Sequence, residues 1–167
     1  MKYSVDKQEK YAVFALEDEN LNSIIAPDLK SEFLMMRNSG VSNMILDLGA
    51  VKFVDSSGLS AILTGNRLWS ADGTFILTGV DSQNIKKLIT ISKLDSILNI
   101  IPTVAESVDY VFMEDIEREL KHYKSHFNNK IVYCNCDDPR VSNFFHFFSS
   151  ILMILIFKAH FNSTSCN

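Results

Sequence analysis

The stretch that decides the fold runs Phe53-Val54-Asp55-Ser56-Ser57-Gly58-Leu59-Ser60-Ala61-Ile62-Leu63. Its first two residues are apolar and end a β-prone segment, and from Leu59 onward the apolar residues recur at helical spacing. The four residues 55–58 therefore separate the end of a strand from the start of a helix that continues to about Trp69. A strand followed at once by a helix is the basic unit of an α/β sheet.

The Asp-Ser-Ser-Gly motif at residues 55–58 admits two interpretations. Asp and Ser are favoured N-cap residues and Gly permits a tight turn, so the motif can be a plain helix cap. Alternatively, a Ser hydroxyl at a helix N-terminus faces free backbone N–H groups and the positive end of the helix dipole, which tolerate a phosphate. A phosphoryl group would add about −1.5 to −2 charge to a surface that a partner recognises. The residues alone leave both interpretations open.

The rest of residues 1–120 alternates between predicted strands and helices. Alternating or continuous apolar residues predict strands over residues 3–6, 11–16, 44–48 and 74–78. Apolar residues at helical spacing predict a first helix between Pro27 and Gly40. Ser82 is placed to cap a later helix, and Thr103-Val104-Ala105-Glu106 fits a capping box that opens a last helix ending near Leu120. This order predicts an α/β sheet with crossover helices.

Composition divides the chain near residue 120. Residues 1–120 hold 18 acidic and 11 basic residues, a net charge of −7, whereas residues 121–167 hold 2 and 5, a net charge of +3. All four His and all three Cys lie in the second segment, together with seven of the twelve Phe. We therefore expect a folded domain at 1–120 and, at 121–167, a C-terminal extension of different origin whose order the sequence leaves open.

The net charge, the N-terminal sequence and the cysteine content also limit the functions expected of the chain. The net charge of −4 for the whole chain gives no reason to expect nucleic-acid binding. The N-terminus, Met1 to Asp6, lacks the apolar run of a signal peptide, which predicts a cytoplasmic location. The absence of Cys from residues 1–120 excludes a disulfide framework there.

The quoted stretch resembles the signature of STAS domains, specifically that of the anti-sigma factor antagonists. Residues 1–120 are similar to that family in element order and length. The resemblance implies a mixed sheet of four to five strands with crossover helices, and it implies that Ser56 is phosphorylated by a cognate anti-sigma-factor serine kinase. The partner-binding positions that it implies are Asn22, Asp55, Ser57, Gly58 and Leu59. On the residues alone, Asn22 is equally an ordinary loop residue.

The function that this resemblance implies is non-enzymatic partner switching. The unmodified protein would bind the anti-sigma kinase and free a sigma factor, phosphorylation of Ser56 would release the kinase, and a phosphatase would reset the switch. The resemblance implies no cofactor, no metal and no direct contact with nucleic acid, and we do not expect membrane attachment. The alternatives are a STAS subunit of a stress-signalling or lipid-transport complex, and an inactive methyltransferase remnant.

Catalytic and ligand-binding alternatives are disfavoured over residues 1–120. A Ser-His-acid triad needs a base near the nucleophile, yet this segment contains no His and no G-x-S-x-G elbow. Neither a P-loop motif nor a G-x-G-x-x-G motif is present. Asp18 and Glu19 lack partners at the spacing of a metal site, so we expect a solvated acidic loop.

A second resemblance lies in the C-terminal extension. Asn129-Lys130-Ile131-Val132-Tyr133-Cys134-Asn135-Cys136-Asp137-Asp138-Pro139, followed by Ser142-Asn143-Phe144-Phe145, is similar to the opening of EcoRI-type adenine-specific DNA methyltransferases. The resemblance fades after Phe148. The Asn/Asp-Pro-Pro-aromatic motif of that family is absent, and the extension is too short for an S-adenosylmethionine-binding sheet, so the activity is not carried over. A fused or frameshifted reading frame would explain the combination.

Two further interpretations concern the same extension. Cys134 and Cys136 together with His122, His126 or His146 suggest metal binding, although C-x-C is not the usual C-x2-C spacing. The apolar run at residues 151–157 is shorter than the roughly 20 residues that a spanning helix needs. It favours a buried or aggregation-prone tail, with weak membrane association as the alternative.

Overall fold

The computed structural model describes residues 1–121. The chain divides into two units, Met1–Val111 and Phe112–Asn167, and the sheet lies in the first. The methyltransferase-like motif, the metal interpretation of the Cys and His residues, and the apolar run at 151–157 all lie outside the described residues.

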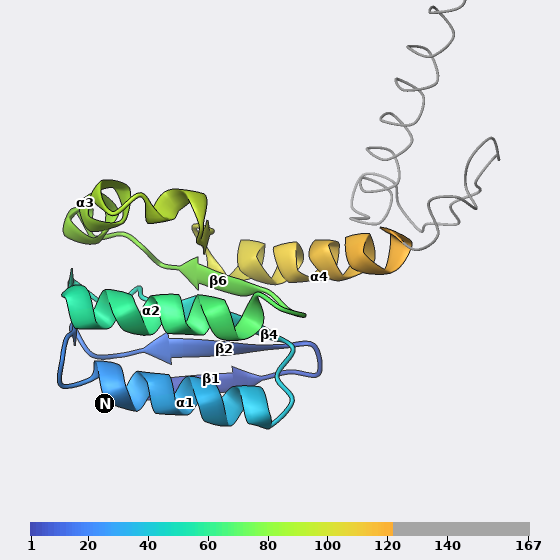
Figure 1. Cartoon of the computed structure of the whole chain (residues 1–167), viewed down its shortest axis with the longest axis horizontal. Helices are drawn as coiled ribbons and strands as arrows, with labels where there is room; N and C mark the ends of the chain where they lie inside the picture. The colour runs from blue at the N-terminus through green and yellow to red at the C-terminus, as the bar shows by residue number, and fades with distance from the viewer. Residues whose placement is uncertain (122–167) are drawn as a thin grey trace, which may run out of the picture. The chain divides into compact units, whose positions relative to one another are not determined.

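A five-stranded mixed sheet forms the centre of the first unit, which confirms the predicted fold class (Figure 1). The strand order is β1-β2-β4-β6-β7, with β1 antiparallel to β2 and all other neighbours parallel. The strands are β1 (Tyr3–Lys7), β2 (Tyr11–Leu16), β4 (Asn43–Asp47), β6 (Phe75–Thr78) and β7 (Asn99–Ile100). A separate two-stranded ribbon pairs β3 (Asn20–Leu21) with β5 (Phe53–Val54).

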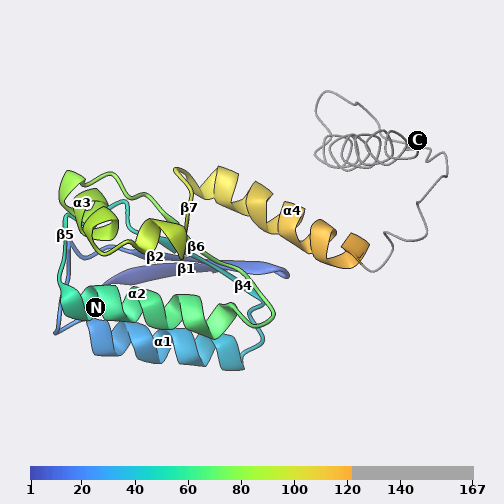
Figure 2. The same cartoon turned by 45° about the horizontal axis from the view of Figure 1, so that its top comes forward.

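Helices cover both faces of the sheet. α1 (Ala26–Asn38) and α2 (Ser56–Trp69) pack side by side on one face, as both views show (Figures 1 and 2). α3 (Gln83–Ile91) follows β6, and a short 3-10 turn (Leu94–Ser96) leads to β7. α4 (Val104–Lys121) begins on the opposite face, where Val111 packs with Ile45 and Ile76.

This two-sided cover explains the apolar strand sequences. In β4, Met44 and Leu46 belong to the main core, while Ile45 belongs to the smaller cluster on the other face. β6 divides in the same way, with Phe75 and Leu77 on one side and Ile76 on the other. A strand buried on both faces carries a continuous apolar run instead of an alternating pattern.

Two local expectations were wrong in detail, and a third was confirmed in part. The solvated loop expected at Asp18 and Glu19 ends at Glu19, because Asn20 and Leu21 form β3 and Leu21 is fully buried. Ser82 does occupy the N-cap position of α3, but its hydroxyl donates to the carbonyl of Lys52 at 2.9 Å instead of capping the helix. At α4, Thr103 Oγ1 accepts from the backbone N–H of Glu106 at 3.2 Å, which is one of the two reciprocal hydrogen bonds of the predicted capping box.

Candidate functional site

The Asp-Ser-Ser-Gly motif lies where two helices begin. The parallel pairing of β3 with β5 places residues 22–25, which lead into α1, beside residues 55–57, which lead into α2. Asp55 is the N-cap of α2, and its Oδ1 accepts from the backbone N–H of Gly58 at 2.8 Å. Its Oδ2 accepts from the backbone N–H of Ser23 at 3.1 Å. One carboxylate therefore caps α2 and fixes the loop that precedes α1.

Asn22 organises the same loop from the other side. Its side-chain Oδ1 accepts from the backbone N–H of Ile24 at 3.0 Å, and its carbonyl accepts from the N–H of Ala26 at 2.8 Å. This is the local pattern of an Asx turn, which places the first residues of α1. Asn22 thus lies at the motif that the resemblance implied, and its contact with a partner stays a prediction.

Gly58 is needed for close packing. It is buried, and a Cβ at this position would lie 2.4 Å from the carbonyl oxygen of Leu21 and 2.8 Å from Leu21 Cγ. Its φ is not positive, because Gly40 and Gly79 are the glycines with positive φ among residues 1–121. The interpretation of Gly58 as a tight-turn residue is therefore wrong: its small size lets α2 approach β3.

The other motif residues differ in their exposure. Ser56 is the first residue of α2 and is exposed, whereas Ser57 is half-buried. Leu59 is half-buried and packs against the main core. Ser56 is therefore the motif hydroxyl most accessible to a modifying enzyme; it is the residue that the resemblance implied, and its phosphorylation stays a prediction.

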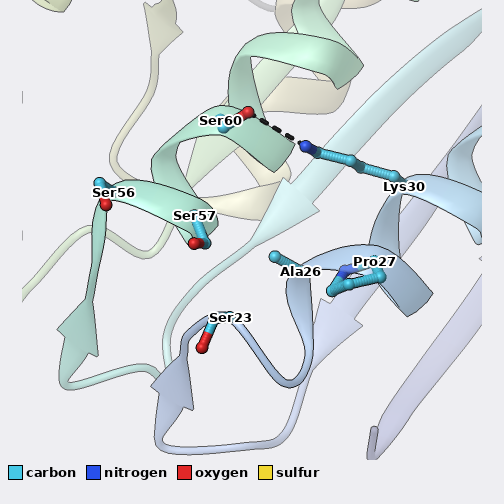
Figure 3. Close-up of a pocket in the computed structure, with 7 residues that line it drawn as sticks. All are labelled: Ser23, Ala26, Pro27, Lys30, Ser56, Ser57 and Ser60. Atoms are coloured by element: carbon cyan, nitrogen blue, oxygen red, sulfur yellow. Dashed lines mark hydrogen bonds between the residues drawn. The ribbon is translucent and has the colours of Figure 1, made fainter.

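A hollow of about 370 Å³ opens beside these serines (Figure 3). Lys30 reaches across it from α1, and its Nζ donates to Ser60 Oγ at 3.0 Å (Figure 3). We call this space the acceptor hollow; its lining residues are Ser23, Ala26, Pro27, Lys30, Ser56, Ser57 and Ser60.

Most of the acceptor hollow was not predicted from the sequence. Ser56 and Ser57 were, but Lys30 and Ser60 were not. Lys30 lies 30 residues before Ser60 and is near it only because α1 packs on α2. The spacing of residues within one helix cannot predict a contact between two helices. The sequence could have indicated only that Ser60 lies one helical turn after Ser56 and therefore near it.

Exposed apolar side chains lie close to the motif in the fold. Ile24, next to the hollow-lining Ser23, is 79% exposed, and Phe53, two residues before Asp55, is 50% exposed. Ile24 and Phe53 therefore leave apolar surface in water on the two segments that lead into α1 and α2. The site thus combines an accessible hydroxyl, one cation and an apolar margin.

Comparison with known proteins identifies the class. The family model of the STAS domain matches residues 3–107, which is more than half of the chain. This chain therefore belongs to the STAS domain family, as its sequence predicted. Its fold is similar to that of an anti-sigma factor antagonist from Mycobacterium paratuberculosis, with a TM-score of 0.60 and 18% identity over 66% of this chain and 92% of that one.

Two structures of one further protein have the same fold. Unphosphorylated SpoIIAA, an anti-sigma factor antagonist, gives a TM-score of 0.57 at 21% identity, covering 66% of this chain and 96% of that one. The phosphorylated form from Bacillus gives 0.53 at 22% identity, covering 66% of this chain and 99% of that one. At these identities the likeness establishes the shared fold.

The C-terminal part matches a different family. The model of the EcoRI adenine-specific methyltransferase covers residues 104–164, a longer segment than the predicted resemblance. The type II methyltransferase M.EcoRI of Escherichia coli is 69% identical over 35 residues, or 21% of this chain. A methyltransferase of Mycoplasma pneumoniae is 46% identical over 41 residues. The chain spans only 11% and 13% of the lengths of these two relatives.

Among residues 1–121, no helix combines the length and the apolar character needed to cross a bilayer.

Proposed function

We propose that this protein is an anti-sigma factor antagonist, a non-catalytic module that binds an anti-sigma factor kinase until Ser56 is phosphorylated. The observation that carries the proposal is the exposed Ser56 on the first turn of α2, next to the acceptor hollow. Membership of the STAS family and the shared fold of anti-sigma factor antagonists support it. The solved structures of SpoIIAA with and without phosphate support control by phosphorylation.

The switch would act through charge. Unmodified Ser56 is neutral and lies close to the exposed apolar residues Ile24 and Phe53, which a partner would cover. A phosphoryl group adds about −1.5 to −2 charge, and burying it in an interface without a counter-charge is costly. The kinase would therefore dissociate from its own product, and a phosphatase would restore binding. All of these partners are expected in the cytoplasm.

The proposed function includes no catalysis by this chain. The methyltransferase-like segment corresponds to 11–13% of the length of the enzymes that it matches, and a cofactor-binding domain needs far more. Saturable binding of S-adenosylmethionine by the full chain would instead favour a methyltransferase-derived function. The remaining alternative is a STAS subunit of a stress-signalling or lipid-transport complex.

The test uses the full chain and the serine-kinase anti-sigma factors encoded in its own genome. Each kinase is incubated with ATP and the chain, the phosphosite is mapped by mass spectrometry, and binding is measured by calorimetry. We expect phosphate on Ser56, unchanged binding for Ser56→Ala, and at least about tenfold weaker binding for Ser56→Asp, a loss of about 1.4 kcal/mol or more.

Ser70→Asp is the matched control, since Ser70 is exposed at the opposite end of the same helix and the charge change is the same. It should bind as the unchanged protein does. Equal binding by Ser56→Asp and the unchanged protein, or phosphate on another residue, would contradict the proposal.

A further inference from the structure

We propose that Lys30 binds the phosphoryl group of the modified protein. Once Ser56 is phosphorylated, the Lys30 ammonium leaves Ser60 and forms an ion pair with that group in the acceptor hollow. The inference rests on the proposed phosphorylation of Ser56 and assigns a role to a residue of the neighbouring helix. In the phosphorylated form, the phosphate would then be bound by the domain itself and would not be fully exposed to solvent.

The position of Lys30 is the first argument. Its Nζ donates to Ser60 Oγ at 3.0 Å, and Ser60 lies one helical turn after Ser56 on α2. Side chains four residues apart on a helix are neighbours, with Cβ atoms about 5–6 Å apart. Ser56 and Lys30 line the same hollow, so a phosphoryl group on Ser56 that enters the hollow would share it with the ammonium.

The space and the charge of the hollow are the second argument. Its volume is about 370 Å³, and a water molecule occupies about 30 Å³, so a phosphoryl group fits with room for water. Lys30 is the one charged residue among those that line it. Asp55, beside Ser56, carries a negative charge that would repel a phosphoryl group. Both of its carboxylate oxygens already accept backbone hydrogen bonds.

The present partner of Lys30 is the third argument. The Lys30 ammonium now donates to a neutral serine hydroxyl, whereas a phosphoryl oxygen is a negatively charged acceptor that adds the attraction between two opposite charges. Lys30 as a whole is half-buried and lines the hollow. Exchange of Ser60 for the phosphoryl group therefore replaces a neutral acceptor by a charged one.

The test measures the phosphate directly and needs no partner protein. Phosphoserine is incorporated at position 56 of the full chain during translation, and its second pKa is followed by phosphorus-31 NMR. Free phosphoserine has a second pKa of about 6, and a cation nearby lowers it because the dianion is favoured. We expect Lys30→Met to raise that pKa by about 0.5 unit or more, and Lys30→Arg to restore most of the difference.

Lys87→Met is the matched control, because Lys87 is an exposed lysine of α3 that does not line the hollow. It should leave the phosphoserine pKa within about 0.2 unit, as expected for a screened surface charge. Equal pKa values for Lys30→Met and Lys87→Met would overturn the role of Lys30. This result is independent of kinase binding, so failure of the partner switch and failure of the lysine contact remain distinguishable.

Discussion

Replacement of Asp55 by Ala tests whether one carboxylate joins the two helix starts of the site. Asp55 accepts from the backbone N–H of Gly58 at 2.8 Å and from that of Ser23 at 3.1 Å. Ala removes both acceptors and leaves two backbone donors without their partner. The loss should therefore exceed that of an ordinary helix cap.

The size of the effect follows from these two bonds. Removal of an N-cap acceptor costs about 1 kcal/mol, and the second hydrogen bond, at a half-exposed position, adds about 1 kcal/mol. We expect Asp55→Ala to lower the free energy of unfolding by about 2 kcal/mol, close to a 30-fold change in the equilibrium constant. Asp55→Asn should lose about half of that, because Asn caps as well as Asp but its amide nitrogen cannot accept from Ser23.

Chemical denaturation of the full chain, followed by circular dichroism, measures these differences. Asp81→Ala is the control, since Asp81 is exposed and the substitution removes the same charge. Its effect should stay within about 0.5 kcal/mol, as for most surface substitutions. If Asp55→Ala costs no more than Asp81→Ala, the carboxylate does not hold the two loops together and the reasoning fails.

Two further substitutions test the packing around the site and at the other face of the sheet. Gly58→Ala should lower the free energy of unfolding by about 1–3 kcal/mol, because its Cβ would lie 2.4 Å from the carbonyl oxygen of Leu21. Ser57→Ala, one residue away, should cost less than about 0.5 kcal/mol in the same denaturation assay, and an equal cost would refute the clash. Val111→Ala should cost about 2 kcal/mol, because Val111 is fully buried against Ile45 and Ile76. Val5→Ala, at a position 40% exposed, should cost clearly less, and the reverse order would show that α4 does not complete the core.

The central strands and helices could be predicted because their signals are local. β4 is a continuous apolar run and α1 has apolar residues at helical spacing, so hydrophobic pattern alone located both. β3 and β7 have two residues each, which is too short for any period to show. They form strands because neighbouring segments supply hydrogen-bond partners, and only the three-dimensional structure determines those pairings.

The same distinction applies to the site. The cap role of Asp55 is local and followed from its position before an apolar-faced helix. Its bond to Ser23, the contact of Lys30 with Ser60 and the approach of Gly58 to Leu21 each join segments at least 30 residues apart in the chain. Ser82 was predicted from its local position to cap a helix, but its hydroxyl donates to the carbonyl of Lys52, 30 residues earlier in the chain. Long-range contacts decided these roles.

The meeting point of the two families lies inside a helix. The STAS model ends at residue 107 and the methyltransferase model begins at 104, so both include the first turn of α4. The buried position Val111 lies seven residues after Val104 and three after Val108, the spacing of one helix face. A join between two coding sequences at this point would preserve the core only if it kept that spacing, because each inserted residue turns the following face by about 100°. Val111 therefore completes the smaller core cluster with Ile45 and Ile76 whichever family residues 104–111 came from, and a join placed before Val111 is expected to keep this helical spacing.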